Sequence, residues 1–87
     1  MKISIVIPNY NGQVLLSQNL PQVIKESQGA QIIVVDDAST DDSLAILKKK
    51  FPQVKTIVKE KNTGFSSTVN LGVKNAKGEL VVLLNSD

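Results

Sequence analysis

The sequence predicts a three-layer α/β/α fold around a mainly parallel sheet. Four short apolar runs alternate with three segments in which apolar residues recur at helical spacing, and polar loops separate them. This alternation favours parallel strands joined by right-handed crossovers, with helices on both faces of the sheet. The 87 residues are enough for one compact core. We expect the strand order 3-2-1-4.

The first strand is predicted over residues 3–7, where β-branched residues dominate and Pro8 ends the run by removing a backbone donor. A polar loop follows over residues 9–12. The first helix is predicted over residues 14–26, because its leucine, valine and isoleucine residues recur at helical spacing. Pro21 is expected to start a fresh turn or to kink this helix.

The second strand is predicted over residues 32–35, and Asp36 and Asp37 open the loop after it. Ser39 and Asp42 fit a capping box, which predicts that the second helix starts here with acids in its positive first turn. Three lysines at positions 48–50 suit the negative end of this helix. They do not indicate a nucleic-acid partner, because aromatic residues make up only 3% of the chain.

The third strand, over residues 54–58, alternates and is expected to be peripheral. A third helix is predicted over residues 66–75, with Val69, Val73 and Ala76 as its inner stripe. The fourth strand, over residues 80–84, is the most apolar of the four and should be a buried strand. With nothing to cover or extend it, its edge would favour self-association, and we expect residues 1–87 to be part of a longer domain.

Composition limits the possible chemistry. The chain contains no cysteine and no histidine, so thiol nucleophiles, thiolate metal sites and an imidazole base are excluded within it. Carboxylates, hydroxyls, amides, lysines and a hard metal ion remain. The formal net charge is only +2, and the first apolar run is too short for a signal peptide or a membrane span. We expect a cytoplasmic protein.

The loops after the strands point to a ligand site. Ligands bind beyond the carboxyl ends of parallel strands, where Pro8, Asn11, the Asp36–Asp37 pair and Asp87 should converge on an acidic cleft. An acidic cleft suits a phosphate ligand only through a divalent cation such as Mg²⁺, and Asp87 is the best placed ligand for it. The alternatives are a solvated Asp87 and an acid pair held by backbone amides.

Tyr10 lies in the first loop, outside the predicted strands and helices. Its ring can stack on a nucleobase, while Asn9 and Asn11 supply donors and acceptors. A tyrosine that covers the rim of the helix is an equally good interpretation. The chain has neither a dinucleotide-binding glycine motif nor a phosphate-binding loop with a lysine, so those two classes are poor fits.

Four ordered segments together resemble family 2 glycosyltransferases, which are inverting nucleotide-sugar enzymes with the Rossmann-like sheet of the GT-A fold. The segments are ISIVIPNYNG, IIVVDDASTDDS, KNTGFSSTVNLGVKNAKGE and LVVLLNSD. The last form is similar to a subset that includes rhamnosyltransferase-like and other cell-surface polysaccharide enzymes. Two departures are Asn85, where many members carry the first acid of an Asp-x-Asp motif, and Val69, where an arginine often precedes the asparagine.

The resemblance implies nucleotide recognition by Pro8, Tyr10 and the Asp36–Asp37 pair, with Asp37 facing the base or ribose. Asp87 would hold Mg²⁺ or Mn²⁺ against the diphosphate of a UDP- or dTDP-linked sugar. The general base and the acceptor-binding half would lie beyond Asp87, so no catalytic base is expected within the chain. The acceptor would be a carbohydrate or a lipid-linked molecule, and the intact enzyme could work at the inner face of the membrane.

Two other functions compete with this interpretation. A receiver-like phospho-switch also places acids around Mg²⁺ at strand ends, but here the acidic pair follows the second strand and not the first. A nucleotide-binding module without catalysis would keep the same first half of the fold. Sequence alone does not separate such a module from a piece of an enzyme.

Overall fold

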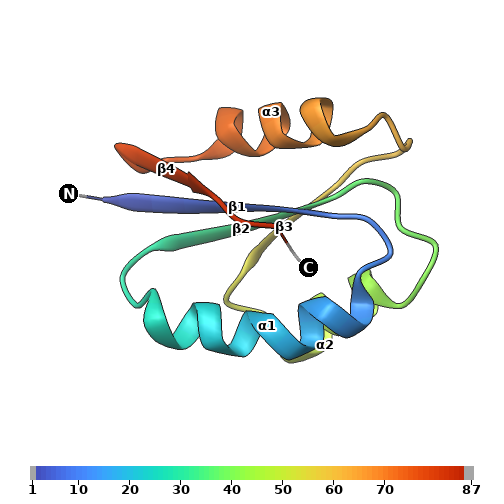
Figure 1. Ribbon diagram of the computed structural model, residues 1–87, viewed down its shortest axis with the longest axis horizontal. Coiled ribbons are helices and arrows are strands. Elements are labelled where there is room, and N and C mark those ends of the chain that lie inside the picture. Colours follow the sequence, from blue (N-terminus) through green and yellow to red (C-terminus); the bar gives the residue numbers. More distant parts are fainter. Residues whose placement is uncertain (1, 86–87) are drawn as a thin grey trace.

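A parallel sheet of four strands lies between two helical layers in the computed structural model, which describes residues 2–85 (Figure 1). The strand order is β3-β2-β1-β4, and each neighbouring pair is parallel, as predicted. Helices α1 and α2 cover one face and α3 covers the other. The elements are β1 (Ile3–Asn9), α1 (Gln13–Glu26), β2 (Gln31–Asp36), α2 (Ser43–Lys50), β3 (Lys55–Val58), α3 (Phe65–Asn75) and β4 (Leu80–Leu83).

The larger core lies between the sheet and the α1/α2 layer. Alternate residues of β1 and β2 point toward this layer and pack against leucines of the two helices. A fully buried aliphatic side chain contributes about 1.5–3 kcal/mol, so this core supplies much of the stability. Its buried members are Ile5, Ile7, Leu16, Leu20, Ile32, Val34, Leu47, Phe51 and Val54.

The core under α3 is thinner, and the predicted inner stripe of this helix is partly wrong. Val73 is 45% exposed, whereas Thr68 and Gly72 are buried against the sheet. A Cβ atom added at Gly72 would lie 2.4 Å from Cγ1 of Val6, so the helix backbone packs closely on the valine side chains of the sheet. The prediction failed because it ranked positions by apolar size, and this contact requires small residues.

The start of α2 also differs from the prediction. The helix begins at Ser43, so Ser39 and Asp42 do not form a capping box and the acids precede the first turn. Asp41 provides the acceptor for the first backbone amide of the helix instead: its Oδ1 accepts a hydrogen bond of 2.9 Å from the backbone N–H of Ser43. In the first helix, Pro21 lies inside a continuous α1.

Strand β4 lies at one edge of the sheet and pairs with β1 from Ile3 to Val6. It was predicted as a buried strand, but Leu80 and Leu83 are 47% and 45% exposed, because β4 is an edge strand that pairs with β1 alone among the described strands. Within residues 2–85, no helix is both long enough and apolar enough to cross a membrane.

Candidate functional site

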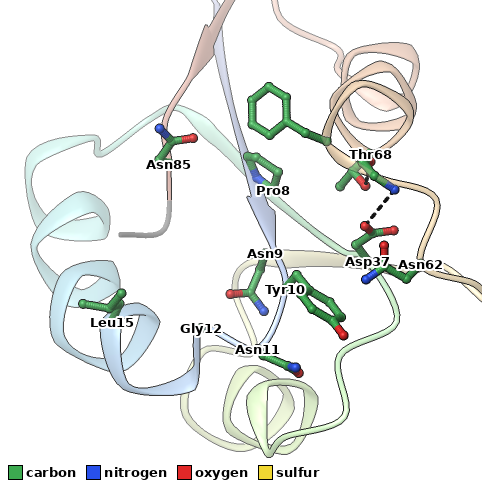
Figure 2. Close-up of a pocket in the computed structure, with 12 residues that line it drawn as sticks. Pro8, Asn9, Tyr10, Asn11, Gly12, Leu15, Asp37, Asn62, Thr68 and Asn85 are labelled. Atoms are coloured by element: carbon green, nitrogen blue, oxygen red, sulfur yellow. Dashed lines mark hydrogen bonds between the residues drawn. The ribbon is translucent and has the colours of Figure 1, made fainter.

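A cavity of about 620 Å³ opens at the carboxyl ends of the central strands β1 and β2. The loop after β1 and the segment before α3 form two of its walls, and Asn85 after β4 lies at another side (Figure 2). The lining residues are Pro8, Asn9, Tyr10, Asn11, Gly12, Leu15, Asp37, Asn62, Gly64, Phe65, Thr68 and Asn85.

Asp36, the last residue of β2, is completely buried and is not among the cavity lining. Its Oδ1 accepts hydrogen bonds from Asn9 Nδ2 at 3.0 Å and from Ser39 Oγ at 2.6 Å. Its Oδ2 accepts a third, of 2.8 Å, from the Ser39 amide. The carboxylate therefore ties the end of β1 to the loop before α2.

Asn11 reinforces this link between the two loops. Its backbone amide donates a hydrogen bond of 2.9 Å to Ser39 Oγ. Its side-chain Oδ1 accepts a hydrogen bond of 2.7 Å from the backbone amide of Thr40. The residue has a positive φ of 52°, a conformation that asparagine tolerates better than most side chains. The Asn11 side chain thus borders the cavity while its carbonyl oxygen is bound within the protein.

Asn9, the last residue of β1, also lines the cavity. Its amide nitrogen is held by Asp36, which fixes the orientation of the carboxamide. Its Oδ1 is buried and, in the described part of the chain, has no hydrogen-bond partner. This oxygen has almost no accessible surface, so it is not open to a ligand although Asn9 lines the cavity.

Asp37 faces the cavity and the segment before α3. Its Oδ1 accepts bonds from the Thr63 amide at 3.1 Å and Lys59 Nζ at 2.9 Å, and its Oδ2 accepts one of 3.1 Å from the Gly64 amide (dashed line in Figure 2). Burial alone would raise the pKa of Asp37. The bonds from Lys59, Thr63 and Gly64 outweigh that effect and lower its pKa, so the group is a carboxylate at neutral pH.

Lys59 contradicts part of the prediction of an acidic cleft, because a lysine lies beside the carboxylate of Asp37. Its side chain is only 9% exposed and neutralises Asp37, the one acid among the described lining residues. The lysine directly follows β3, which placed it among the strand ends that hold the other polar residues. The position of Lys59 directly after a strand could have identified it as a site residue. It was not considered because the third strand was expected to be peripheral.

Two of the three aromatic residues of the chain border the cavity. Tyr10 is 50% exposed and Phe65 is 57% exposed, whereas Phe51 belongs to the core. Large exposed rings at one concave site are suited to contact a planar ligand. Sequence reasoning selected Tyr10 and Pro8, both of which line the cavity, but it missed Phe65, an aromatic residue directly after the turn at Gly64.

The described residues do not fit a divalent cation by themselves. Residues 2–85 contain no group of three or more acidic side chains arranged to hold a metal ion. Three of the about four acceptor positions of the Asp37 carboxylate are used by a lysine and two backbone amides. Asp87, the predicted metal ligand, lies outside the described residues, and Asn85 is the nearest described residue of its motif at the cavity.

Comparisons with known proteins agree with one another. The sequence profile described as Glycosyl transferase family 2 matches residues 4–87. Poly(ribitol-phosphate) beta-glucosyltransferase of Bacillus spizizenii is 43% identical over 94 residues, which cover 100% of this chain and 15% of that protein. Dolichol-phosphate mannosyltransferase of Pyrococcus furiosus is 37% identical over 92 residues, or 100% of this chain and 26% of that protein.

Solved structures show the same similarity. The crystal structure of S. aureus TarS 1-349 in complex with UDP superposes with a TM-score of 0.86 and 32% identity, over 100% of this chain and 28% of that one. The structure of the same protein with UDP-GlcNAc gives a TM-score of 0.84. The chain spans 15%, 36% and 26% of the length of the first three curated relatives that it matches.

Proposed function

Because the chain belongs to glycosyltransferase family 2, we propose that it binds a nucleotide-diphosphate sugar and forms the donor half of an enzyme that transfers the sugar with inversion. The sheet order and helices are those of the family's GT-A fold. The relatives named above are glycosyltransferases, and the solved relative binds UDP and UDP-GlcNAc. A UDP- or dTDP-linked sugar is therefore the donor we propose.

The observation that carries this proposal is the combination of Tyr10 and Asp37 in one cavity. The cavity volume of about 620 Å³ lies within the range of small-molecule sites. Tyr10 offers a half-exposed ring for base stacking, and Asp37 offers a carboxylate oxygen to an N–H of the base. Uracil, thymine and guanine carry such an N–H group on their pairing edge.

The predicted site residues then divide into two groups. We propose that Pro8, Tyr10 and Asp37 contact the nucleotide. Asp36 and Asn11 act by holding the loops, since their polar atoms are engaged with Asn9 and with the loop before α2.

A divalent cation, Mg²⁺ or Mn²⁺, belongs to the proposal through Asp87 and the resemblance alone. When bound, such an ion stabilises the negative charge that develops on the diphosphate as it leaves. The roles given to residues 2–85 do not depend on it, because Asp37 is paired with Lys59 and binds through hydrogen bonds.

The remaining steps are assigned to parts of the intact enzyme outside this chain. We propose that the general base and the binding site for a carbohydrate or lipid-linked acceptor lie there, and that the 87 residues alone do not turn over. The intact enzyme would act in the cytoplasm at the inner face of the membrane. Family membership removes the support for a receiver-like switch, whereas a module that binds nucleotide without transfer keeps the same cavity.

The experiment is an amide NMR titration of the isotope-labelled chain with UDP, dTDP and GDP, each with and without Mg²⁺ and Mn²⁺. We expect metal-independent shifts at Asp37 and Gly64 and an upfield shift of the ring protons of Tyr10, which is the single tyrosine of the chain. The absence of shifts at these positions with every nucleotide would overturn the proposal. Sugar transfer by a longer chain, compared with binding alone, separates an enzyme from a module.

A further inference from the structure

Lys59 makes more polar side-chain contacts than an exposed lysine would. Its Nζ lies 2.9 Å from Asp37 Oδ1, 3.0 Å from Thr68 Oγ1 and 3.2 Å from Ser67 Oγ. It also donates to Thr63 Oγ1. The Lys59 amide donates to the backbone oxygen of Asp36 at 2.9 Å, so the residue is fixed at both ends.

Core packing does not account for a buried lysine at this position. Removing an ammonium group from water is costly unless charges and hydrogen bonds compensate, and lysine is seldom buried without them. Here the compensation comes from the carboxylate of Asp37 and from three hydroxyl groups. Asp37 and Thr68, which carry two of these four groups, line the cavity. The contact of Lys59 with Asp37 is the single ion pair within residues 2–85.

The contacts leave one face of Asp37 available. A carboxylate has about four acceptor positions, and three are used by Lys59, Thr63 and Gly64. Lys59 and Thr63 both bind Oδ1, whereas Oδ2 accepts only from Gly64. Oδ2 therefore keeps an acceptor position at the wall of the cavity.

We propose that Lys59 is a positioning residue for nucleobase recognition: it holds Oδ1 of Asp37 against the hydroxyls at the start of α3 and so presents Oδ2 to an N–H of the base. This inference rests on the proposed function. Because the ion pair has no net charge, the wall selects a neutral hydrogen-bond donor and does not attract a cation. The chemical class it recognises is a base with an imide or lactam N–H, such as uracil.

UDP and CDP provide a matched pair of ligands, because they share the ribose and the diphosphate but differ on the pairing edge of the base. Uracil presents an N–H donor at N3, where cytosine presents an acceptor. We expect the wild-type chain to bind UDP about tenfold more tightly than CDP, the scale of one charge-assisted hydrogen bond. In Lys59→Met this preference should fall to about twofold or less, since Asp37 is no longer held in place.

A double-mutant cycle tests whether Lys59 acts through Asp37. Lys59→Met alone should weaken UDP binding about tenfold, whereas in the Asp37→Asn background the same change should cost about twofold or less. Lys61→Met is the matched control, because Lys61 is exposed and two residues away, and it should leave both affinities unchanged. Lys59→Arg keeps the charge and should restore part of the UDP preference.

Binding is measured by NMR titration of the full chain, and dispersed amide spectra confirm that each variant is folded. If Lys59→Met does not fold, the affinities for UDP and CDP are compared instead between wild type, Lys59→Arg and the double variant Lys59→Met/Asp37→Asn. A preference for UDP that survives in Lys59→Met or in the double variant, or fully additive losses, would overturn the inference while leaving the proposed function intact. If the wild-type chain binds no nucleotide, the proposed function fails and the inference fails with it.

Discussion

Asp36 and Asp37 are adjacent carboxylates at the end of one strand, yet they serve two different parts of the molecule. Asp36 continues the alternation of β2 toward the α1/α2 layer, where neutral donors of Asn9 and Ser39 surround it completely. Asp37 turns toward the α3 layer, where a lysine and two loop amides hold it at the cavity wall. One acid joins loops, and the other borders the cavity.

The difference teaches that proximity in sequence is a poor guide to shared function at the end of a buried strand. Successive side chains point to opposite faces, so two neighbouring residues enter two separate hydrogen-bond networks. An acidic pair in the sequence consequently does not make an acidic pair in space. Neutralising Asp36 and Asp37 in separate variants should distinguish a loss of folding stability from a loss of nucleotide binding.

The largest effect is expected from Asp36→Asn. The side-chain NH₂ of the new asparagine is a donor, and it would face either the backbone N–H of Ser39 or the side-chain NH₂ of Asn9. At least one of these buried donors therefore loses its acceptor. We expect a loss of about 3–4 kcal/mol in the free energy of unfolding, measured by urea denaturation. Asp42→Asn, at an exposed neighbouring acid, is the control and should change stability by less than about 0.5 kcal/mol. Equal stability of the two variants would contradict the structural role of Asp36.

Asp37→Asn should have a smaller effect on the fold, about 2 kcal/mol, because Lys59 keeps three hydroxyl partners when the carboxylate is gone. The wild-type stabilisation also depends on pH. The pKa of Asp37 is lower in the folded chain than in the unfolded one, so its contribution is complete above the ordinary aspartate range and is lost as pH falls through the folded value.

The gap in unfolding free energy between wild type and Asp37→Asn should therefore narrow as the solution is acidified below pH of about 4. Urea denaturation at a series of pH values measures it. Lys59 is the charged group that faces Asp37 in the described residues, and Lys61→Met serves as a lysine control. A gap that stays constant down to strongly acidic pH would show that the ion pair does not stabilise the fold.

The smallest effect on stability is expected from Tyr10→Ala, since half of this side chain is exposed. Unfolding should change by less than about 0.5 kcal/mol. Nucleotide affinity should fall by about 1–3 kcal/mol, the range measured for stacking of a base on an aromatic ring. Tyr10→Phe keeps the ring and should bind UDP like the wild type. Loss of binding in both variants would assign the effect to the hydroxyl group and not to stacking.

Much of the sheet could be predicted from the sequence, because strand positions and order follow from local patterns. The apolar runs, the helical spacing and the polar strand ends are all readable along the chain. The start of α2 was not readable in the same way. Ser39 has the right spacing for a cap, but its hydroxyl binds Asp36, three residues earlier, and the backbone amide of Asn11 in the distant loop after β1. A local bond and a tertiary contact together decided the outcome.

The candidate site was predicted in part for a similar reason. Pro8, Tyr10 and Asp37 follow strand ends and line the cavity as expected. Lys59 was missed because a single lysine in a chain with ten is ordinarily a surface residue, and nothing local marks it as buried. The positions of charged residues along the sequence do not show which of them form ion pairs. The pair of Lys59 with Asp37 forms because the ends of β2 and β3 are neighbours in the sheet.

The close seat of α3 on the sheet also has an evolutionary consequence. Because an added Cβ at Gly72 would lie 2.4 Å from Cγ1 of Val6 and 3.0 Å from Cγ2 of Val35, a larger residue at position 72 requires smaller side chains on the strands. Relatives should therefore exchange volume between position 72 and positions 6 and 35, which are far apart in sequence. A relative that enlarges position 72 without this exchange would need its helix farther from the sheet, which would move Thr68 at the cavity wall.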